Sequence, residues 1–489
     1  MTRSALPVVA AGLLAGCASV NPQPAFVDVQ RKVTERTGQE ARWISSAQEA
    51  DDATGMVRGL LTQELTADRA AQVALVNNRS LQATLTEIGV SQAEFAQATR
   101  VSNPDFHSFV RFPDRPPDGT NVELSLFQDF LDILVQPLRK KLGAAQLEQT
   151  KLRVGDEMLR LMAETKAAYY TLVARRQLVS RLELIRELGQ TAAEFARKQQ
   201  EAGNINDLER LNHDAAYNQS KVEVALAQVE VRRDRERLNR LMGLWGADTD
   251  WKAEARLPEI PGQEIPFERL ESLAVRQRLD LDAARWGVDL VGRALALKKK
   301  TRFFPIGIQV GIQREKGTDG QRVTGPSLEL QLPIFDTGKA QVALLEAEYL
   351  RAQRQLEALA VNARSEVREA RDSMIAARDL AGYYGTVLLP QRFAILEQTQ
   401  RHYNMMFKGA YDLLLAKQAE AQAERARIEA WRDYWIARTE LERALGGRLP
   451  RPGDAGEAQA SPPNPQGSRA VAPDAAESRT KQTDGGTER

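Results

Sequence analysis

The feature that most constrains this chain is a set of heptad patterns longer than any compact domain is wide. Between residues 341 and 377, apolar or small side chains recur in steps of three and four residues, with one irregular step. Residues 139–201 continue a similar pattern for about 60 positions, which is roughly 90 Å of helix at 1.5 Å per residue. This spacing is typical of coiled coils. We therefore predict long paired helices, with a break near Leu389 because Pro390 removes a hydrogen-bond donor.

The same order of features occurs twice, about 200 residues apart. Each half has an amphipathic helix that runs into a proline, then two strands, a very long helix, a turn and a second long helix. This order predicts one duplicated body, with a first repeat at residues 65–246, a linker at 247–266 and a second repeat at 267–447. Residues 448–489 are rich in Pro, Gly, Ser, Ala and charge, a composition that predicts a disordered tail.

Short segments with a period of two residues predict strands with one apolar and one polar face. The clearest pair flanks a polar, glycine-bearing loop at residues 315–324, which indicates a hairpin. A soluble sheet with its apolar face on a core would show the same alternation, but the heptad seams already use the apolar faces of the neighbouring helices. We therefore predict strands of an outer-membrane β-barrel. The residues predicted to face lipid are Ile306, Ile308, Val310, Ile312, Leu328, Leu330 and Leu332.

Four strands are too few to close a membrane barrel, which needs about eight or more. Lipid also does not accept open sheet edges, because their backbone groups would lack hydrogen-bond partners. Several copies of the chain must therefore share one barrel. Three copies would supply twelve strands, which supports a homotrimer without requiring it, and two copies would give a narrow eight-stranded barrel.

The single cysteine of the chain, Cys17, lies before any predicted folded element. A short cationic start and an apolar run of about ten residues precede it, as in a secretory signal. The sequence Leu14-Ala15-Gly16-Cys17 resembles the lipobox of bacterial lipoproteins. This resemblance implies a signal peptide at residues 1–16, lipidation of Cys17 and an N-terminal lead-in at residues 17–64. The alternative is an ordinary signal with a chance cysteine at its end.

Several short sequences, taken with the duplicated order, resemble the TolC-like outer-membrane efflux family, in its lipoprotein branch. They are Leu65-Thr66-Ala67-Asp68-Arg69-Ala70, Ala74-Leu75-Val76-Asn77-Asn78, Asn103-Pro104 before a strand, and two turns between the long helices. One turn runs from Gly203 to Asp207 and the other from Gly409 to Asp412, so that the second is one residue shorter. We expect both glycines to be left-handed and each aspartate to begin the returning helix.

The resemblance implies a mainly α-helical protein with a β-barrel portion. Three copies would form a 12-stranded barrel in the outer membrane, continued by a coiled-coil tunnel across the periplasm. Such a channel would meet a periplasmic adaptor and an inner-membrane efflux pump at the helix turns, where Gly203, Asp207, Gly409 and Asp412 lie. It would be anchored to outer-membrane lipid through Cys17, and it would carry out no chemistry and need no cofactor.

Other classes of protein fit the sequence less well. A periplasmic adaptor lipoprotein is the main alternative, but it would not need a duplication or lipid-facing strand pairs. A purely structural coiled coil leaves the strands unexplained. The three histidines, His107, His213 and His402, fall in separate elements, which argues against an enzyme or a metal centre, although His402 with Met405 and Met406 has the spacing of a helical face. A net charge of +1 gives no footprint for nucleic acid.

Overall fold

The computed structural model describes residues 20–114, 119–262, 269–302, 306–331 and 334–449. All of them belong to one compact unit that ends at Leu449. The predictions for Cys17, Leu332, the signal peptide and the tail beyond residue 449 lie outside the described residues. The elements are α2 (Gln23–Thr37), α3 (Ala47–Leu61), α4 (Ala67–Asn77), α5 (Arg79–Ala98), β1 (Asp105–Arg111), β2 (Asn121–Asp129), α6 (Phe130–Glu201), α7 (Asp207–Met242), η2 (Gly246–Thr249), α8 (Leu270–Gln277), α9 (Leu279–Thr301), β3 (Ile306–Lys316), β4 (Arg322–Gln331), α10 (Lys339–Tyr383), η3 (Tyr384–Leu388), α11 (Leu389–Asn404) and α12 (Ala410–Ala444).

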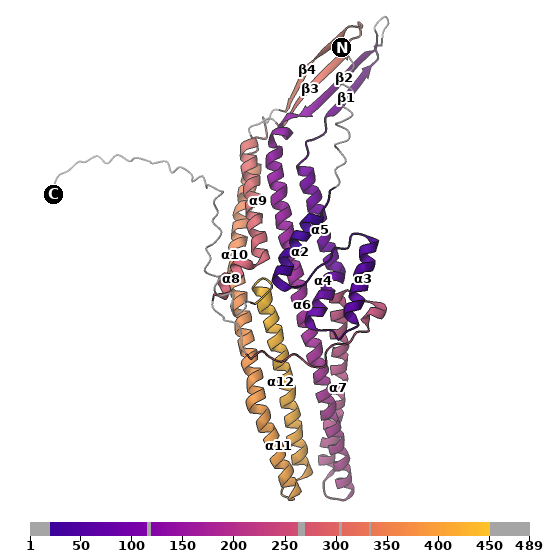
Figure 1. The fold of residues 1–489 in the computed structure, drawn as a ribbon, viewed down its shortest axis with the longest axis vertical. Coiled ribbons are helices and arrows are strands. Elements are labelled where there is room, and N and C mark those ends of the chain that lie inside the picture. The colour runs from indigo at the N-terminus through magenta and orange to yellow at the C-terminus, as the bar shows by residue number, and fades with distance from the viewer. Residues whose placement is uncertain (1–19, 115–118, 263–268, 303–305, 332–333, 450–489) are drawn as a thin grey trace, which may run out of the picture. The chain divides into compact units, whose positions relative to one another are not determined.

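The predicted repetition of elements is confirmed. The order α5, β1, β2, α6, α7 returns as α9, β3, β4, α10 with α11, and α12. In the unit that these elements form, the four strands lie at one end of the helices and the two hairpin turns lie at the other (Figure 1). Among the described residues, no helix combines the length and the apolar character of a membrane span.

Helix α6 is longer than the sequence predicts. It has 72 residues and begins at Phe130, so the predicted start at Arg139 is wrong. The Asp129 side chain accepts a hydrogen bond from the Asp132 N–H at 3.0 Å, which caps the earlier start. Pro137 lies within the helix without ending it. The buried Asp132 carboxylate also pairs with Arg139 across this proline and accepts the Ser102 N–H at 2.8 Å, and these contacts hold the first turns in place.

The predicted interruption of the second long helix is confirmed, but it is a widened turn rather than a break. A π-helical segment, Tyr384–Leu388, connects α10 to α11, and Pro390 follows in the first turn of α11. Proline cannot donate to the carbonyl four residues earlier, and a π turn rearranges the hydrogen bonds around that position without ending the helix. The heptad seam therefore continues through a local change of helical phase.

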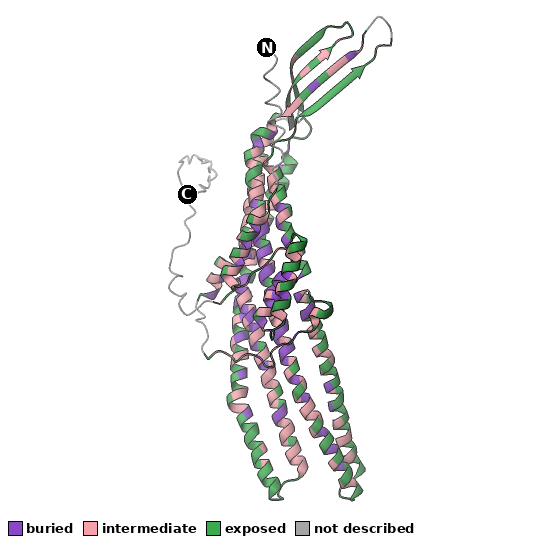
Figure 2. Cartoon of the chain, turned by 45° about the vertical axis from the view of Figure 1, so that its right-hand side comes forward, coloured by how far each residue is buried: buried purple, intermediate pink, exposed green. Residues whose placement is uncertain are grey.

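Buried residues gather in the central part of the helices (Figure 2). One cluster joins α2, α4, α5, α6 and α9, and another joins α3, α4, α6, α7 and the segment after α7. The motif residues Asn77 and Asn78 connect these elements, because their side-chain amides donate to the carbonyls of Met242 and Leu241 at 3.0 and 2.8 Å. They hold the C-terminal end of α7 against the junction of α4 and α5.

The second repeat uses a different polar group at the corresponding junction. Arg278, which is buried between α8 and α9, donates to Asp280 at 2.7 Å and to Glu366 of α10 at 2.6 Å. The chain thus keeps the architecture of the repeat while it replaces neutral amides by an ion-pair network.

The strands form one antiparallel sheet in the order β1-β2-β3-β4. The β3–β4 hairpin is tighter than predicted, because pairing continues from Val310↔Leu328 to Lys316↔Arg322. The turn closes with a hydrogen bond from the Gly317 N–H to the Gln321 carbonyl at 2.9 Å. Strands β1 and β4 are the two edges of this sheet.

Candidate functional site at the sheet and the helix turns

One face of the sheet is apolar near its base and exposed. Among the residues predicted to face lipid, Val310, Ile312, Leu328 and Leu330 are 47%, 57%, 63% and 44% exposed. The register places Val310 beside Leu328, and Ile312 beside Leu126 of β2. Ile308 is half-buried, and Ile306 lies beyond a register shift between Ile306 and Gln309. The described part of the sheet thus presents a row of large apolar side chains without a covering core.

The opposite face carries a connected set of polar side chains. Asn121 of β2 donates to Glu315 of β3 at 2.7 Å, and Gln313 donates to Glu123. Arg111 of β1 pairs with Glu123 at 3.3 Å. Asn121 and Ser125 are buried on this face. The two faces therefore differ in polarity along three adjacent strands, not only within one.

The first helix turn has the geometry that the sequence predicts. Gly203 has φ of 74°, and its N–H donates to the Gln200 carbonyl at 2.9 Å. The next N–H, of Asn204, reaches back to the Gln199 carbonyl at 2.8 Å. This pair of bonds ends a helix at a left-handed residue. Asp207 is the first residue of α7, and its carboxylate accepts from the Gln200 side chain at 3.2 Å.

The second turn differs from the prediction. Gly409 has φ of −82° and ψ of 167°, so it is extended and not left-handed. The left-handed residue is Met406, with φ of 62°, and its N–H donates to the Tyr403 carbonyl at 2.9 Å. The Phe407 N–H reaches the His402 carbonyl at 2.9 Å. The prediction failed because a methionine occupies the position at which a helix end usually has glycine.

The two turns are structurally equivalent and equal in length, which corrects the prediction that the second is shorter. Met406 corresponds to Gly203, and the cap residue Gly409 corresponds to the cap residue Asn206. Asp412 therefore corresponds to Glu209 and not to Asp207. Both Glu209 and Asp412 occupy the third position of the returning helix, where a carboxylate is favoured by the helix dipole.

Asp412 caps the start of α12 from its third position. Its carboxylate accepts the Gly409 N–H at 3.0 Å and the Lys408 ammonium at 3.3 Å. The bond from the Gly409 N–H, and to a lesser extent the Lys408 ammonium, lower the pKa of the Asp412 carboxyl below its usual range. The group is therefore charged at neutral pH. Asp412 thus has the capping role that the sequence predicts, and it keeps its negative charge at the exposed tip.

A ring contact between the two hairpins was not predicted. Tyr411 of α12 stacks on His213 of α7 with the ring centres 4.1 Å apart, and it meets Phe195 of α6 edge-on at 5.7 Å. Its hydroxyl is buried without a hydrogen-bond partner among the described residues, and burial raises its pKa. No local signal marks this contact, because it joins residues about 200 positions apart. His213 is therefore a packing residue rather than a metal ligand.

The remaining candidates for a metal site do not assemble. Helix α11 ends at Asn404, so His402, Met405 and Met406 do not share a helical face. In the described ranges, no group of three or more His, Cys, Asp or Glu side chains is placed to hold a metal ion.

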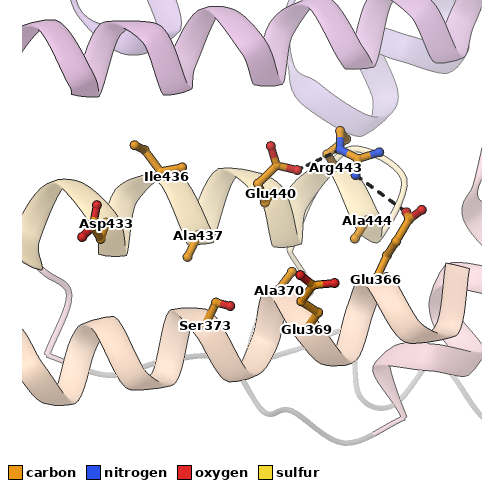
Figure 3. Close-up of a pocket in the computed structure, with 10 residues that line it drawn as sticks. All are labelled: Glu366, Glu369, Ala370, Ser373, Asp433, Ile436, Ala437, Glu440, Arg443 and Ala444. Atoms are coloured by element: carbon orange, nitrogen blue, oxygen red, sulfur yellow. Dashed lines mark hydrogen bonds and ion pairs between the residues drawn. The ribbon is translucent and has the colours of Figure 1, made fainter. Parts of the chain in front are cut away.

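A pocket of about 390 Å³ lies between α10 and α12 (Figure 3). Its charged lining is Glu366, Glu369, Asp433, Glu440 and Arg443. Arg443 pairs with Glu440 at 2.9 Å and with Glu366 at 3.7 Å, as the dashed lines of Figure 3 show. The Arg443–Glu366 pair links α12 to α10, whereas the Arg443–Glu440 pair lies within α12, so the pocket is part of the packing of the two helices.

Comparison with known proteins supports the fold. No protein-family model and no curated protein matches the sequence. Among solved structures, the chain is similar to the CmeC outer membrane channel of Campylobacter jejuni, with a TM-score of 0.68 at 16% identity over 80% of this chain and 88% of that one. It is also similar to the outer membrane protein VceC of Vibrio cholerae, with a TM-score of 0.63 at 17% identity over 78% and 97%.

The MtrE outer membrane channel of Neisseria gonorrhoeae gives a TM-score of 0.61 at 18% identity over 78% of this chain and 89% of that one. At these identities the likeness establishes the fold. The chain therefore has the fold of the TolC-like outer-membrane channels, which is the fold that its sequence resembles.

Proposed function

We propose that this chain is the outer-membrane channel component of a tripartite efflux system, in which it receives substrates from an inner-membrane pump and a periplasmic adaptor. The observation that carries the proposal is the sheet. It has an exposed apolar face, a hydrogen-bonded polar face and two open edges. This combination suits a segment of a barrel wall, with the apolar face in lipid and the polar face toward a lumen.

In this proposal three copies form the barrel. Strand β4 of one copy pairs with β1 of the next, which satisfies the edges that lipid does not accept. The helix hairpins of the three copies then continue the barrel as a tunnel into the periplasm. The adaptor alternative is not favoured, because the similar solved structures are outer-membrane channels.

The lipid anchor at Cys17 fits the position of the first described residues. Pro22 packs beside Gly89, which lies in the middle of α5. The Pro22 Cβ is 4.0 Å from the position that a Cβ on Gly89 would occupy. From Gly89 to the end of α5 is about 14 Å at the helical rise. Five peptide steps from Pro22 to Cys17 reach at most ~18 Å. Cys17 can therefore reach the level of the end of α5, from which the chain leads into β1.

Metabolic labelling with palmitate tests this anchor. The wild type should incorporate label and Cys17→Ser should not. Equal labelling of the two proteins would contradict the assignment of Cys17.

We place the pump-facing entrance at the helix turns. Met406 and Phe407 are 93% and 73% exposed, and Met406 keeps a conformation that methionine disfavours. A strained residue that is retained at an exposed tip suggests a functional contact there, here with the adaptor. If the tips converge about a threefold axis, Asp412 becomes a ring of three negative charges, which can bind and select cations.

Single-channel recording in planar bilayers tests both the channel and its entrance. The purified wild type should give discrete conductance steps with a preference for cations. Asp412→Asn keeps a side chain that can cap the helix but removes the charge, so it should lose the cation preference, as should Asp412→Ala. A wild type without conductance would refute the proposed function. An effect of Asp412→Ala alone would show that Asp412 is a cap and that the gate lies elsewhere.

A further inference from the structure

The connections between the sheet and the helices carry a concentration of basic side chains. We define the junction surface by Lys140 and Lys141 of α6, Lys298, Lys299 and Lys300 of α9, and Lys339 of α10. The first two lie in the third and fourth turns from the sheet end of α6, the next three in the last turn of α9, and Lys339 is the first residue of α10. The whole chain has a net charge of only +1, so this clustering is local.

These lysines lie on adjacent helices. Helix α9 packs against both α6 and α10. A cleft of about 330 Å³ opens between the three helices at this level, and it is lined mainly by Leu142, Leu297, Lys298 and Leu344. The cleft brings apolar side chains of all three helices beside a lysine, in the same few turns that carry the other basic residues.

Helix polarity does not account for the charges. The lysines at the end of α9 are favoured by its dipole, but Lys339 stands at the start of α10, where a cation is disfavoured. Lys140 and Lys141 lie beyond the first turn of α6, where the dipole has little effect. What the six lysines share is their position next to the sheet.

Acidic side chains at the same level make other contacts. Asp129 accepts the Asp132 N–H, and Asp336 accepts the Gly338 N–H at 2.8 Å. Asp132 is buried and pairs with Arg139. Lys299 pairs with Glu346 at 2.6 Å. Lys140, Lys300 and Lys339 are exposed, and within the described residues they have no ion-pair partner.

Large apolar side chains protrude on the sheet side of the lysines. Ile133 and Leu134 in the first two turns of α6 are 44% and 55% exposed, and Phe130 is 45% exposed. Ile334 and Phe335, between β4 and α10, are 70% and 101% exposed. An apolar band followed by cations matches the order of acyl chains and anionic headgroups that is met on leaving a membrane.

We propose that the junction surface binds the headgroups of anionic phospholipids. These lipids belong to the membrane leaflet nearer the helices. This inference rests on the proposed function, because it takes the sheet to lie in a membrane. The lysines attract the phosphate groups while the neighbouring aromatic and aliphatic side chains enter the acyl region. Anionic lipid is thereby a specific ligand of the assembled channel and fixes how deeply the sheet is inserted.

The test uses purified full-length protein in a neutral detergent, titrated with phosphatidylglycerol or phosphatidylcholine and examined by native mass spectrometry. The wild type should retain more phosphatidylglycerol than phosphatidylcholine. The triple variant Lys140→Gln, Lys300→Gln, Lys339→Gln should lose this preference, with affinity falling about fivefold per lysine. A matched triple variant at exposed lysines far from the sheet, Lys198→Gln, Lys221→Gln, Lys252→Gln, should keep it.

A preference that survives the junction substitutions, or that the distant substitutions remove equally, would overturn the inference. Conductance recorded in bilayers of neutral lipid separates this result from the proposed function. A wild type that conducts but shows no lipid preference refutes the junction surface alone. A wild type that binds phosphatidylglycerol through these lysines without conducting refutes the channel and leaves the lipid site.

Discussion

At the scale of single residues, the two helix turns show how one backbone geometry is reached with different side chains. Gly203 and Met406 both have positive φ and end a long helix with the same pair of hydrogen bonds. A left-handed conformation costs an L-residue roughly 1–2 kcal/mol, because its Cβ approaches the following carbonyl oxygen. The second turn therefore carries a strain that the first avoids.

Replacing Met406 by glycine should relieve this strain. We expect Met406→Gly to raise the free energy of local opening at the tip by about 1 kcal/mol. The Phe407 amide donates a hydrogen bond to the His402 carbonyl, and its hydrogen exchange should then slow about fivefold. Met405→Gly is the matched control, since Met405 has φ of −89° and gains nothing from glycine. Faster exchange in Met406→Gly would contradict the argument.

A second residue, Asp156 of α6, makes stability depend on pH. Burial raises the pKa of Asp156 from 3.8 to about 6, and the nearby negative charge of Asp280 adds to this effect. The positive charges of Arg278 and Arg443 act in the opposite direction but are outweighed. Between these values the folded protein keeps a proton that the unfolded chain has lost. Stability therefore falls as pH rises from about 4 to about 6, and the loss is complete above pH 6.

Replacing Asp156 by a neutral side chain should prevent the loss of stability at neutral pH. The rise of the Asp156 pKa from 3.8 to about 6 corresponds to about 3 kcal/mol. We expect Asp156→Asn to increase the free energy of unfolding by up to this amount at pH 7.5 and to change it little at pH 4. Denaturation at the two pH values measures the difference, with Asp51→Asn on the exposed face of α3 as the control. An equal effect of Asp156→Asn at both values would refute the assignment.

At the scale of elements, the strands can be tested one face at a time. Val310 and Gln309 are neighbours on β3 and point to opposite faces. An arginine in the lipid costs ~2–4 kcal/mol near the middle of the membrane, whereas a lumen position tolerates charge. Val310→Arg should therefore reduce the amount of assembled protein far more than Gln309→Arg, whose new charge lies near Asp105. Gel electrophoresis under mild conditions measures the assembled fraction, and equal losses would contradict the facing of the sheet.

Much of this level of structure follows from the sequence, because it depends on periodicity. The heptad seams predict the long helices, and alternation predicts the strands. The features that the sequence did not predict depend on single contacts. The start of α6 is set by a cap at Asp129 and by the Asp132–Arg139 pair across Pro137. The left-handed Met406 carries no local signal, and the Tyr411–His213 contact exists only after the two hairpins pack together.

At the scale of the whole molecule, the duplication explains how one chain would supply a repeating part of the proposed channel wall. Each repeat contributes two strands and one helix hairpin, and the four strands join edge to edge in one sheet. The sheet has an apolar face without a core and two edges without partners among the described residues, so it is incomplete as a membrane element. In the proposed channel, association of identical copies about an axis would complete it without any new type of contact.

The number of copies in the purified, detergent-solubilised protein tests this account most directly. Native mass spectrometry of the full-length wild type should show a complex of three chains, which gives a barrel of twelve strands. A complex of two chains would mean a narrow eight-stranded barrel. A single chain, with both sheet edges unpaired in detergent, would contradict the central claim that the sheet is one segment of a shared barrel.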